Sequence, residues 1–214
     1  GTVWRLGPVV VKTRSRGPVH ALTSEADGLR ALRDKQSPAP FVHIDEPDML
    51  VMDYIASGPP RWETLGRTLA LQHRCDAAYY GWDKATMLAS VSLSNDITSN
   101  WTDFWIEHRL RPLHRVVHHQ LGSLNRGIER LLHTFVPPVE GPCLIHGDLW
   151  CGNVIMGLDQ PYLIDPSVFF GERLVDIAMM KLFGGFPDEM WRAYESIYPI
   201  PVGYRDALPY YQLY

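Results

Sequence analysis

The sequence has few cysteines and no long apolar run. Its 214 residues include three cysteines, Cys75, Cys143 and Cys151, and no two of them form a CxxC pair. An odd, scattered set of thiols is typical of a reducing compartment rather than of a disulfide-stabilised fold. No apolar stretch approaches the ~18 residues of a membrane-spanning helix, and the first twelve residues lack a signal-peptide pattern. We therefore expect a cytoplasmic protein that does not associate with membranes.

The sequence also lacks an excess of positive charge. It has 20 Lys and Arg against 24 Asp and Glu, with a formal net charge of -4. A nucleic-acid partner is therefore not expected, because such proteins present a basic surface. The hydrophobic fraction of 46% and the charged fraction of 21% are ordinary for a globular protein. The length allows one domain or two small lobes with a real core, and nothing in the composition indicates an oligomeric state.

Apolar patterning predicts strands and a helix before residue 56. The run 9–11 is rich in valine and predicts a short buried strand that ends at Lys12, and residues 50–54 predict a second strand. Between them, apolar residues recur at helical spacing over 22–32. Ser24 with Asp27 fits a capping box, unless the helix begins nearer Pro18.

The residues at positions 56–60, Ala-Ser-Gly-Pro-Pro, end the second strand and read as a linker. We therefore predict an N-terminal nucleotide-binding lobe over 1–55, a hinge over 56–60 and a mainly helical C-terminal lobe over 61–214. The helical lobe should include helices over 102–121 and 123–135, the first bent or broken at Pro112.

A unit of three short strands interrupts the predicted helices over 143–166. Its strands are expected at residues 143–145, 154–156 and 162–164. A polar loop joins the first two strands, a turn joins the last two, and Asp165 follows the third. Two carboxylates and an amide therefore lie on the loops at the ends of one hairpin.

The loop His146-Gly147-Asp148-Leu149-Trp150-Cys151-Gly152-Asn153 fits the spacing H-x-D-L-x-x-x-N of a kinase catalytic loop. Phosphoryl transfer needs a carboxylate to accept the proton of the attacking hydroxyl, and oxygen ligands to hold Mg²⁺ against the phosphates of ATP. Asp148 stands where the base is expected, and Asn153 and Asp165 where the metal ligands are expected. A surface loop in which Asp and Asn only form turns is the alternative.

Lys12 and Glu25 support the same function. Glu25 lies on the apolar stripe of the first helix, where an unpaired acid is costly, and Lys12 ends the preceding strand. The two resemble the lysine–glutamate pair that orients ATP phosphates in kinases. We predict a salt bridge between them; a solvated Glu in the first helical turn is the alternative.

Two absences indicate a small-molecule substrate. Gly147 stands where protein kinases have the arginine of H-R-D, and Asp165-Pro166-Ser167 stands in place of D-F-G, with no A-P-E after it. There is little basis here for control by a phosphorylated activation loop. Adenine is expected on the backbone of Asp53, Tyr54 and Ile55, where the second strand meets the linker.

With these motifs the sequence resembles the fructosamine kinases (ketosamine-3-kinases). The catalytic loop is similar to their HGDLWSGN loop, and Asp165-Pro166 to their metal-binding Asp-Pro. Further likeness is found in Gly171, Asp176-Ile177-Ala178-Met179-Met180, Leu182-Phe183-Gly184-Gly185-Phe186, Tyr211-Gln212-Leu213-Tyr214 and, upstream, Glu25-Ala26-Asp27-Gly28-Leu29.

The resemblance implies an α+β, two-lobed, protein-kinase-like fold close to that of the aminoglycoside phosphotransferases. It implies ATP- and Mg²⁺-dependent phosphorylation of the 3-hydroxyl of ketosamines such as fructosamine or ribulosamine. Asp148 would be the base, Asn153 and Asp165 would bind Mg²⁺, and Lys12 with Glu25 would serve the nucleotide. Asp176 would brace the catalytic loop through hydrogen bonds.

The sequence departs from the family pattern in places. Leu174 stands where the family usually has Glu, and Cys151 where it has Ser. The N-terminal lobe is expected to lack its first strand and part of the phosphate loop, and a further helical segment is expected to be missing after Tyr214. A kinase of another small alcohol, such as an aminoglycoside or choline, and a nucleotide-binding pseudokinase are the other interpretations.

Two residues of the catalytic loop allow two interpretations each. Cys151 is either a small packing residue or a redox switch. Trp150 either forms a wall of the substrate pocket or belongs to the core.

Overall fold

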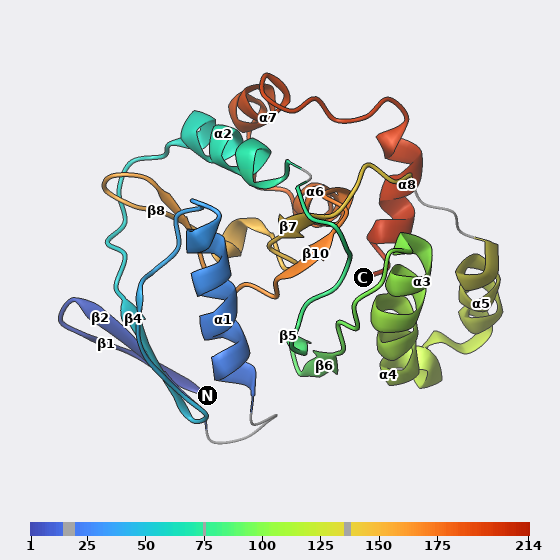
Figure 1. The fold of residues 1–214 in the computed structure, drawn as a ribbon, viewed down its shortest axis with the longest axis horizontal. Coiled ribbons are helices and arrows are strands. Elements are labelled where there is room, and N and C mark those ends of the chain that lie inside the picture. The colour runs from blue at the N-terminus through green and yellow to red at the C-terminus, as the bar shows by residue number, and fades with distance from the viewer. Residues whose placement is uncertain (15–19, 75, 135–137) are drawn as a thin grey trace.

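The structure, a computed structural model, describes residues 1–14, 20–74, 76–134 and 138–214. An antiparallel sheet at the N-terminal end is followed by a region in which helices predominate (Figure 1). This arrangement is α+β, as predicted from the sequence. None of the helices in the described ranges is long and apolar enough to span a bilayer.

The N-terminal sheet has four strands in the order β1-β2-β4-β3, all antiparallel to their neighbours. They are β1 (Thr2–Leu6), β2 (Val9–Thr13), β3 (Val42–Glu46) and β4 (Met49–Asp53). The two predicted strands correspond to β2 and β4. Neither edge strand was predicted. β1 is exposed along its whole length, and in β3 three of the five residues are polar and a register shift interrupts the pairing after Val42.

Helix α1 (Ala21–Asp34) covers one face of this sheet (Figure 1). Leu22, Leu29 and Leu32 are buried, so the predicted apolar stripe is confirmed. The stripe faces the sheet side on which Leu50 of β4 is also buried. Burial of the apolar stripe fixes which face of α1 meets the strands. It therefore also fixes the direction in which Glu25, on the same helix, projects.

The predicted capping box is wrong. Ser24 lies inside α1, where its hydroxyl donates to the Ala85 carbonyl at 3.4 Å. The Asp27 carboxylate instead accepts from Lys84 at 2.6 Å. Both side chains therefore bind residues about sixty positions further along the chain. Local spacing does not reveal such contacts. The alternative start near Pro18 lies outside the described residues.

A helical segment with a change of geometry runs from residue 101 to 121. It consists of α3 (Trp101–Trp105), a π-helical turn η1 (Ile106–Leu110) and α4 (Arg111–Leu121). Pro112 lies in the first turn of α4, where its missing N–H costs least. The sequence predicted a bend or break at Pro112; the structure instead has a continuous helical run with a wider π-helical turn that ends at Leu110, two residues before the proline.

The remaining elements of the chain's middle and end are mainly helices. They are α2 (Trp62–Gln72), β5 (Thr86–Leu88), β6 (Val91–Leu93), η2 (Gly122–Leu124), α5 (Asn125–Thr134), α6 (Leu174–Phe183), α7 (Asp188–Glu195) and α8 (Tyr204–Tyr211). The helix predicted over 123–135 corresponds to η2 and α5, and residue 135 lies outside the described part of the chain.

The three predicted catalytic strands are present, with a fourth strand after them. They are β7 (Cys143–Ile145), β8 (Val154–Met156), β9 (Pro161–Leu163) and β10 (Phe169–Gly171). β8 pairs with β9 as a hairpin, whereas β7 pairs with β10. The loop after β7 and the segment after β9 therefore end side by side, where Ser167 N–H donates to the His146 carbonyl at 2.8 Å.

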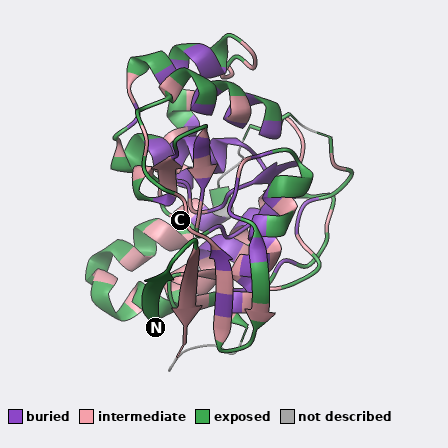
Figure 2. Cartoon of the chain, turned by 90° about the vertical axis from the view of Figure 1, so that its left-hand side faces the viewer, coloured by how far each residue is buried: buried purple, intermediate pink, exposed green. Residues whose placement is uncertain are grey.

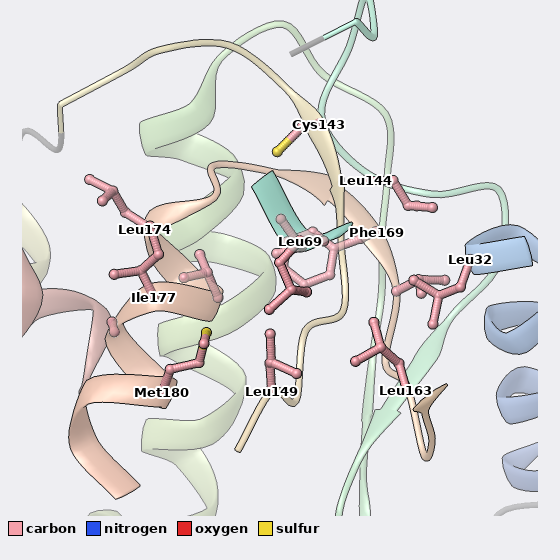
Figure 3. Packing of buried hydrophobic residues seen from close by; sticks show 14 of the residues in the cluster. Leu32, Leu69, Cys143, Leu144, Leu149, Leu163, Phe169, Leu174, Ile177 and Met180 are labelled. Carbon is pink, nitrogen blue, oxygen red and sulfur yellow. The ribbon is translucent and has the colours of Figure 1, made fainter. Parts of the chain in front are cut away.

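The buried apolar residues form one cluster that joins the N-terminal sheet and α1 to the helices (Figure 2). Figure 3 shows Leu32 of α1, Leu69 of α2, Leu144 of β7 and Ile177 of α6 around the catalytic strands. Close packing on both sides of these short strands limits how far the loops at their ends can shift.

The predicted hinge at 56–60 lies against the β8–β9 turn. Gly58 N–H donates to the Met156 carbonyl at 2.6 Å, and Ser57 forms a bridge with Gly157. A Cβ on Gly58 would lie 2.4 Å from the Gly157 carbonyl oxygen, so the approach requires glycine. The division into 1–55, 56–60 and 61–214 stays a prediction.

Gly66 allows α2 and α7 to pack closely, and this contact generates a stability prediction. A Cβ at position 66 would lie 2.3 Å from the Met190 carbonyl oxygen. We expect Gly66→Ala to lower the free energy of unfolding by ~1–3 kcal/mol, since the helices must separate. Denaturant unfolding followed by circular dichroism measures the change.

Gly127→Ala is the matched control for this substitution. Gly127 also lies in a helix, α5, but a Cβ there meets no atom within 4 Å. It should leave stability unchanged or raise it by up to ~1 kcal/mol through helix propensity. Equal effects of the two substitutions would show that the α2–α7 contact does not depend on Gly66.

Candidate functional site

A tight turn positions the catalytic loop after β7. Gly147 has a φ of +78°, and a Cβ there would lie 2.1 Å from the Ser167 carbonyl oxygen. Only glycine fits both the conformation and the space. The loop then passes through the short 3-10 turn η3 (Cys151–Asn153) and enters β8. The turn therefore fixes the direction in which Asp148 leaves the β7 strand.

The Asp176 carboxylate holds this turn through hydrogen bonds to its backbone. It lies fully buried in the first turn of α6 and accepts from His146 N–H at 2.7 Å and Gly147 N–H at 2.9 Å. The bracing role predicted for Asp176 is confirmed in its geometry. Burial alone would raise the pKa of this carboxyl, but the hydrogen bond and attraction of His73, with further contributions from His146, hold the pKa below its usual range.

His73, the C-cap residue of α2, continues this network, and the sequence analysis did not identify it as a functional residue. Its Nε2 lies 3.2 Å from Asp176, so it must donate to the carboxylate, and its Nδ1 then accepts from the Tyr194 hydroxyl at 2.9 Å. The Tyr194 oxygen in turn accepts from Arg173 at 3.1 Å. A polar residue on an otherwise apolar helix face is the sequence signal that could have indicated this role.

His146 joins the two catalytic segments. Its Nδ1 accepts from Asp148 N–H at 3.2 Å, and its Nε2 donates to the Ile164 carbonyl at 2.9 Å. Burial lowers the pKa of this imidazole, consistent with the neutral tautomer that these two bonds require. The histidine of the motif therefore ties the loop carrying Asp148 to the residue before Asp165.

Asp148 and Asn153 face each other across the loop. The Asn153 amide nitrogen donates to the Asp148 carbonyl at 2.7 Å and to its carboxylate at 3.1 Å. Both bonds use the amide nitrogen of Asn153, so its amide oxygen can still serve as a ligand. Burial raises the pKa of Asp148, while His146 and Asn153 oppose the shift.

Lys12, Glu25 and Asp165 meet at the end of β2. The predicted contact is confirmed: Lys12 Nζ lies 2.6 Å from Glu25 Oε1, and it also contacts the Asp165 carboxylate. Burial opposes the charge of Lys12, yet attraction to both acids raises its pKa. Burial raises the pKa of Glu25 to about 7 against the opposing effect of Lys12. Asp165 adopts a left-handed φ of +54°, a costly conformation for a residue with a side chain.

A cavity of about 330 Å³ opens beside Asp148. It is lined by Leu88, Asp148, Trp150, Met179, Leu182, Phe183, Tyr211, Gln212 and Tyr214. Trp150 is 40% exposed and faces Phe183 with ring centroids 6.1 Å apart, so it is a pocket wall rather than a core residue. The sequence analysis did not place Leu88, or the lining residues at and just after the end of α8, in this cavity, because they lie about 60 positions or more from Asp148 on either side.

Cys151 lies on the far side of the same loop. A Cβ added to Gly185 would come within 2.7 Å of its sulfur, so the thiol packs closely against the chain after α6. This contact supports the interpretation of Cys151 as a small packing residue.

The backbone at 53–55 is partly committed within the fold. Asp53 N–H donates to the Phe41 carbonyl at 2.9 Å, and Tyr54 N–H to the Pro8 carbonyl at 2.8 Å. Among the described residues, Ile55 N–H makes no such backbone bond. Of the backbone groups predicted to bind adenine, Ile55 N–H and the carbonyls of this segment are therefore the ones that remain available for hydrogen bonds.

The Asp176 network generates a second prediction. Asp176→Asn replaces one acceptor oxygen with an amide that faces a buried donor. We expect the free energy of unfolding to fall by ~1–3 kcal/mol at pH 7, measured by urea unfolding. Because the folded pKa lies below the ordinary 3.8, this contribution is present above that value and is lost as the pH falls through the folded pKa.

The difference between parent and variant should therefore be constant above about pH 5 and shrink below about pH 4. Asp34→Asn is the control, since Asp34 is exposed in the last turn of α1. A difference in stability that persists unchanged to pH 2 would contradict the ionised state assigned to Asp176.

Comparison with known proteins identifies the family. The family model "Fructosamine kinase" matches residues 5–214. A "Probable ketoamine kinase" of Thermus thermophilus is 42% identical over 212 residues, which cover 99% of this chain and 80% of that protein. The crystal structure of a "putative fructosamine-3-kinase" of Thermobifida fusca has a TM-score of 0.83 at 30% identity, over 96% of this chain and 76% of that one.

More distant structures share the fold alone. An ADP-bound aminoglycoside phosphotransferase has a TM-score of 0.61 at 18% identity, and the match covers 95% of this chain and 75% of that chain. The kinase-like fold and the family resemblance predicted from the sequence are thus confirmed. The chain belongs to the fructosamine kinase family and is a nucleotide-using kinase of small molecules.

Proposed function

We propose that the protein transfers the γ-phosphate of ATP to the 3-hydroxyl of a ketosamine, such as fructosamine or ribulosamine on a glycated amine. The observation that carries this proposal is the position of Asp148. Its carboxylate borders the cavity beside Trp150 and also a second cavity of about 270 Å³ that Glu25 and Asp165 line. One carboxylate therefore faces both the space for an acceptor and the space beside the phosphate-binding residues.

Asp148 acts as the base in this proposal. It accepts the proton of the acceptor hydroxyl as the hydroxyl oxygen attacks the γ-phosphorus and the bond to the β-phosphate oxygen breaks. The hydrogen bond from Asn153 and the contact of Asp148 N–H with His146 orient the carboxylate before the acceptor arrives. Such prior orientation lowers the cost of reaching the reactive geometry.

Asn153 and Asp165 would hold Mg²⁺, which neutralises phosphate charge during transfer. The donor set fits this ion, because both residues offer oxygen and the Asn153 nitrogen is already committed to Asp148. Within the described residues there is no group of three or more His, Cys, Asp or Glu side chains that forms a complete metal cage. Two protein ligands completed by phosphate and water are typical of magnesium in kinases.

Lys12 and Glu25 would serve the nucleotide. Glu25 orients the Lys12 ammonium toward the phosphates, and the adenine would meet the segment Asp53, Tyr54 and Ile55 at Ile55 N–H. The interaction of a nucleobase edge with a free backbone N–H needs no special side chain. Arg5 stacks on the Tyr54 ring at 3.7 Å and steadies this segment.

The first test is the loss of the base. Asp148→Asn should lower kcat by ~10²–10⁴-fold, because proton acceptance is lost, with little change in the KM of the ketosamine. Coupled measurement of ADP release with fructosyl-lysine gives both constants. Asp159→Asn in the β8–β9 turn is the matched control and should keep the parent kcat, since Asp159 is exposed, accepts from the Tyr162 hydroxyl at 3.0 Å and lines neither of the two cavities beside Asp148.

The second test addresses the acceptor. Purified protein is incubated with ATP, Mg²⁺ and, separately, fructosyl-lysine, ribulosyl-lysine, choline and an aminoglycoside, and products are identified by mass spectrometry. We expect a mass gain of one phosphate on a ketosamine only. Phosphorylation of choline or the aminoglycoside and of neither ketosamine would overturn the acceptor while preserving the kinase activity. ATP binding without any product would favour a pseudokinase.

A further inference from the structure

Asp165 already has a cationic partner in the fold. The Lys12 ammonium contacts both Glu25 and Asp165, and both ion pairs made by these two acids in the described part of the chain use Lys12. The Lys12 and Glu25 side chains are only 14% and 15% exposed, whereas Asp165 is 45% exposed. The least buried member of the trio is therefore the proposed metal ligand.

The cavity beside these residues is short of positive charge. Glu25, Asp148 and Asp165 all line it, and Lys12 is the cation in contact with two of them. With all three acids ionised, the group carries a formal charge of minus two. A divalent cation would balance this charge, but at Asp165 it would meet the ammonium of Lys12.

We propose that Lys12 is a built-in counter-ion of the metal site, which holds Asp165 in the nucleotide-free protein and is drawn away by the nucleotide. The proposal rests on the proposed function, since it takes Asp165 as a metal ligand and Lys12 as a phosphate ligand. Its consequence is that a divalent cation binds weakly alone, and that nucleotide and metal each strengthen the binding of the other.

Simple electrostatics gives the reason. Two cations that share one carboxylate repel each other, and this repulsion is poorly screened beside buried groups. The phosphates of a nucleotide present several anionic oxygens, which can receive the N–H groups of Lys12 and so free Asp165. Coupling between two ligands is reciprocal, so the metal must favour the nucleotide as much as the nucleotide favours the metal.

The test measures Mn²⁺ binding without nucleotide, with Mn²⁺ as the probe because its free form is quantified by electron paramagnetic resonance. Lys12→Met keeps the aliphatic stem and removes the charge. It should lower the Kd for Mn²⁺ by roughly tenfold or more relative to the parent. Lys35→Met is the matched control: Lys35 pairs with Asp76 on the surface at 2.5 Å, and its loss should leave the Kd unchanged.

A second substitution assigns the gain to Asp165. Asp165→Asn in the Lys12→Met background should abolish the added affinity. Lys12→Met leaves the Glu25 carboxylate buried without its cation, which lowers the stability of the fold. The variant Lys12→Met/Glu25→Gln removes this buried charge, and the Mn²⁺ measurement is repeated with it. Circular dichroism establishes that each variant is folded.

A Kd for Mn²⁺ that is unchanged or higher in both Lys12→Met and Lys12→Met/Glu25→Gln would overturn the proposal. Such a result would mean that Lys12 and a metal occupy different oxygens of Asp165 without competing. This outcome is distinguishable from failure of the proposed function, which is decided by product formation from ketosamines and not by metal binding.

Discussion

The buried carboxylate of Asp176 is the constraint on which the catalytic loop depends. Backbone N–H groups of His146 and Gly147 point into the core, where they have no access to water, and Asp176 supplies an acceptor for each. His73 donates to the carboxylate as well and further stabilises its ionised form at this buried site. One interaction therefore joins α2, α6 and the loop, and it sets the direction in which Asp148 points.

Sequence patterns were informative where residues lie close along the chain. Spacing alone singled out Asp148, Asn153 and Asp165, whose roles stay proposals, and the structure places Asn153 in hydrogen-bond contact with Asp148. The acid on an apolar stripe correctly predicted that Glu25 meets Lys12. These patterns failed where contacts come from afar: Ser24 matched a capping pattern, but Ala85 accepts its hydrogen bond. Leu88 and the residues of α8 that line the cavity carry no local signal, because only the packed fold brings them to Asp148.

Gly147 shows how one residue supports two explanations. From the sequence, its presence marks the absence of the arginine that protein kinases carry, and so favours a small acceptor. In the structure it is required by a φ of +78° and by a carbonyl of Ser167 that any side chain would strike. The second reason is independent of the acceptor, so Gly147 alone is weaker evidence for the substrate class than the cavity lined by Trp150 and Phe183.

The candidate site therefore has two parts, one held by hydrogen bonds and the other, at Asp165, held by an ion pair. Hydrogen bonds from buried groups hold Asp148 and Asn153, and neither needs a ligand to fix its place. Asp165 differs, since it is nearly half exposed, has a costly backbone conformation and is neutralised by a lysine from another element. Close packing of the surrounding core holds this backbone conformation in place. Under the proposed function, Asp148 and Asn153 are therefore held in place by the fold before any ligand binds, whereas Asp165 would exchange its lysine partner for a metal when the nucleotide binds.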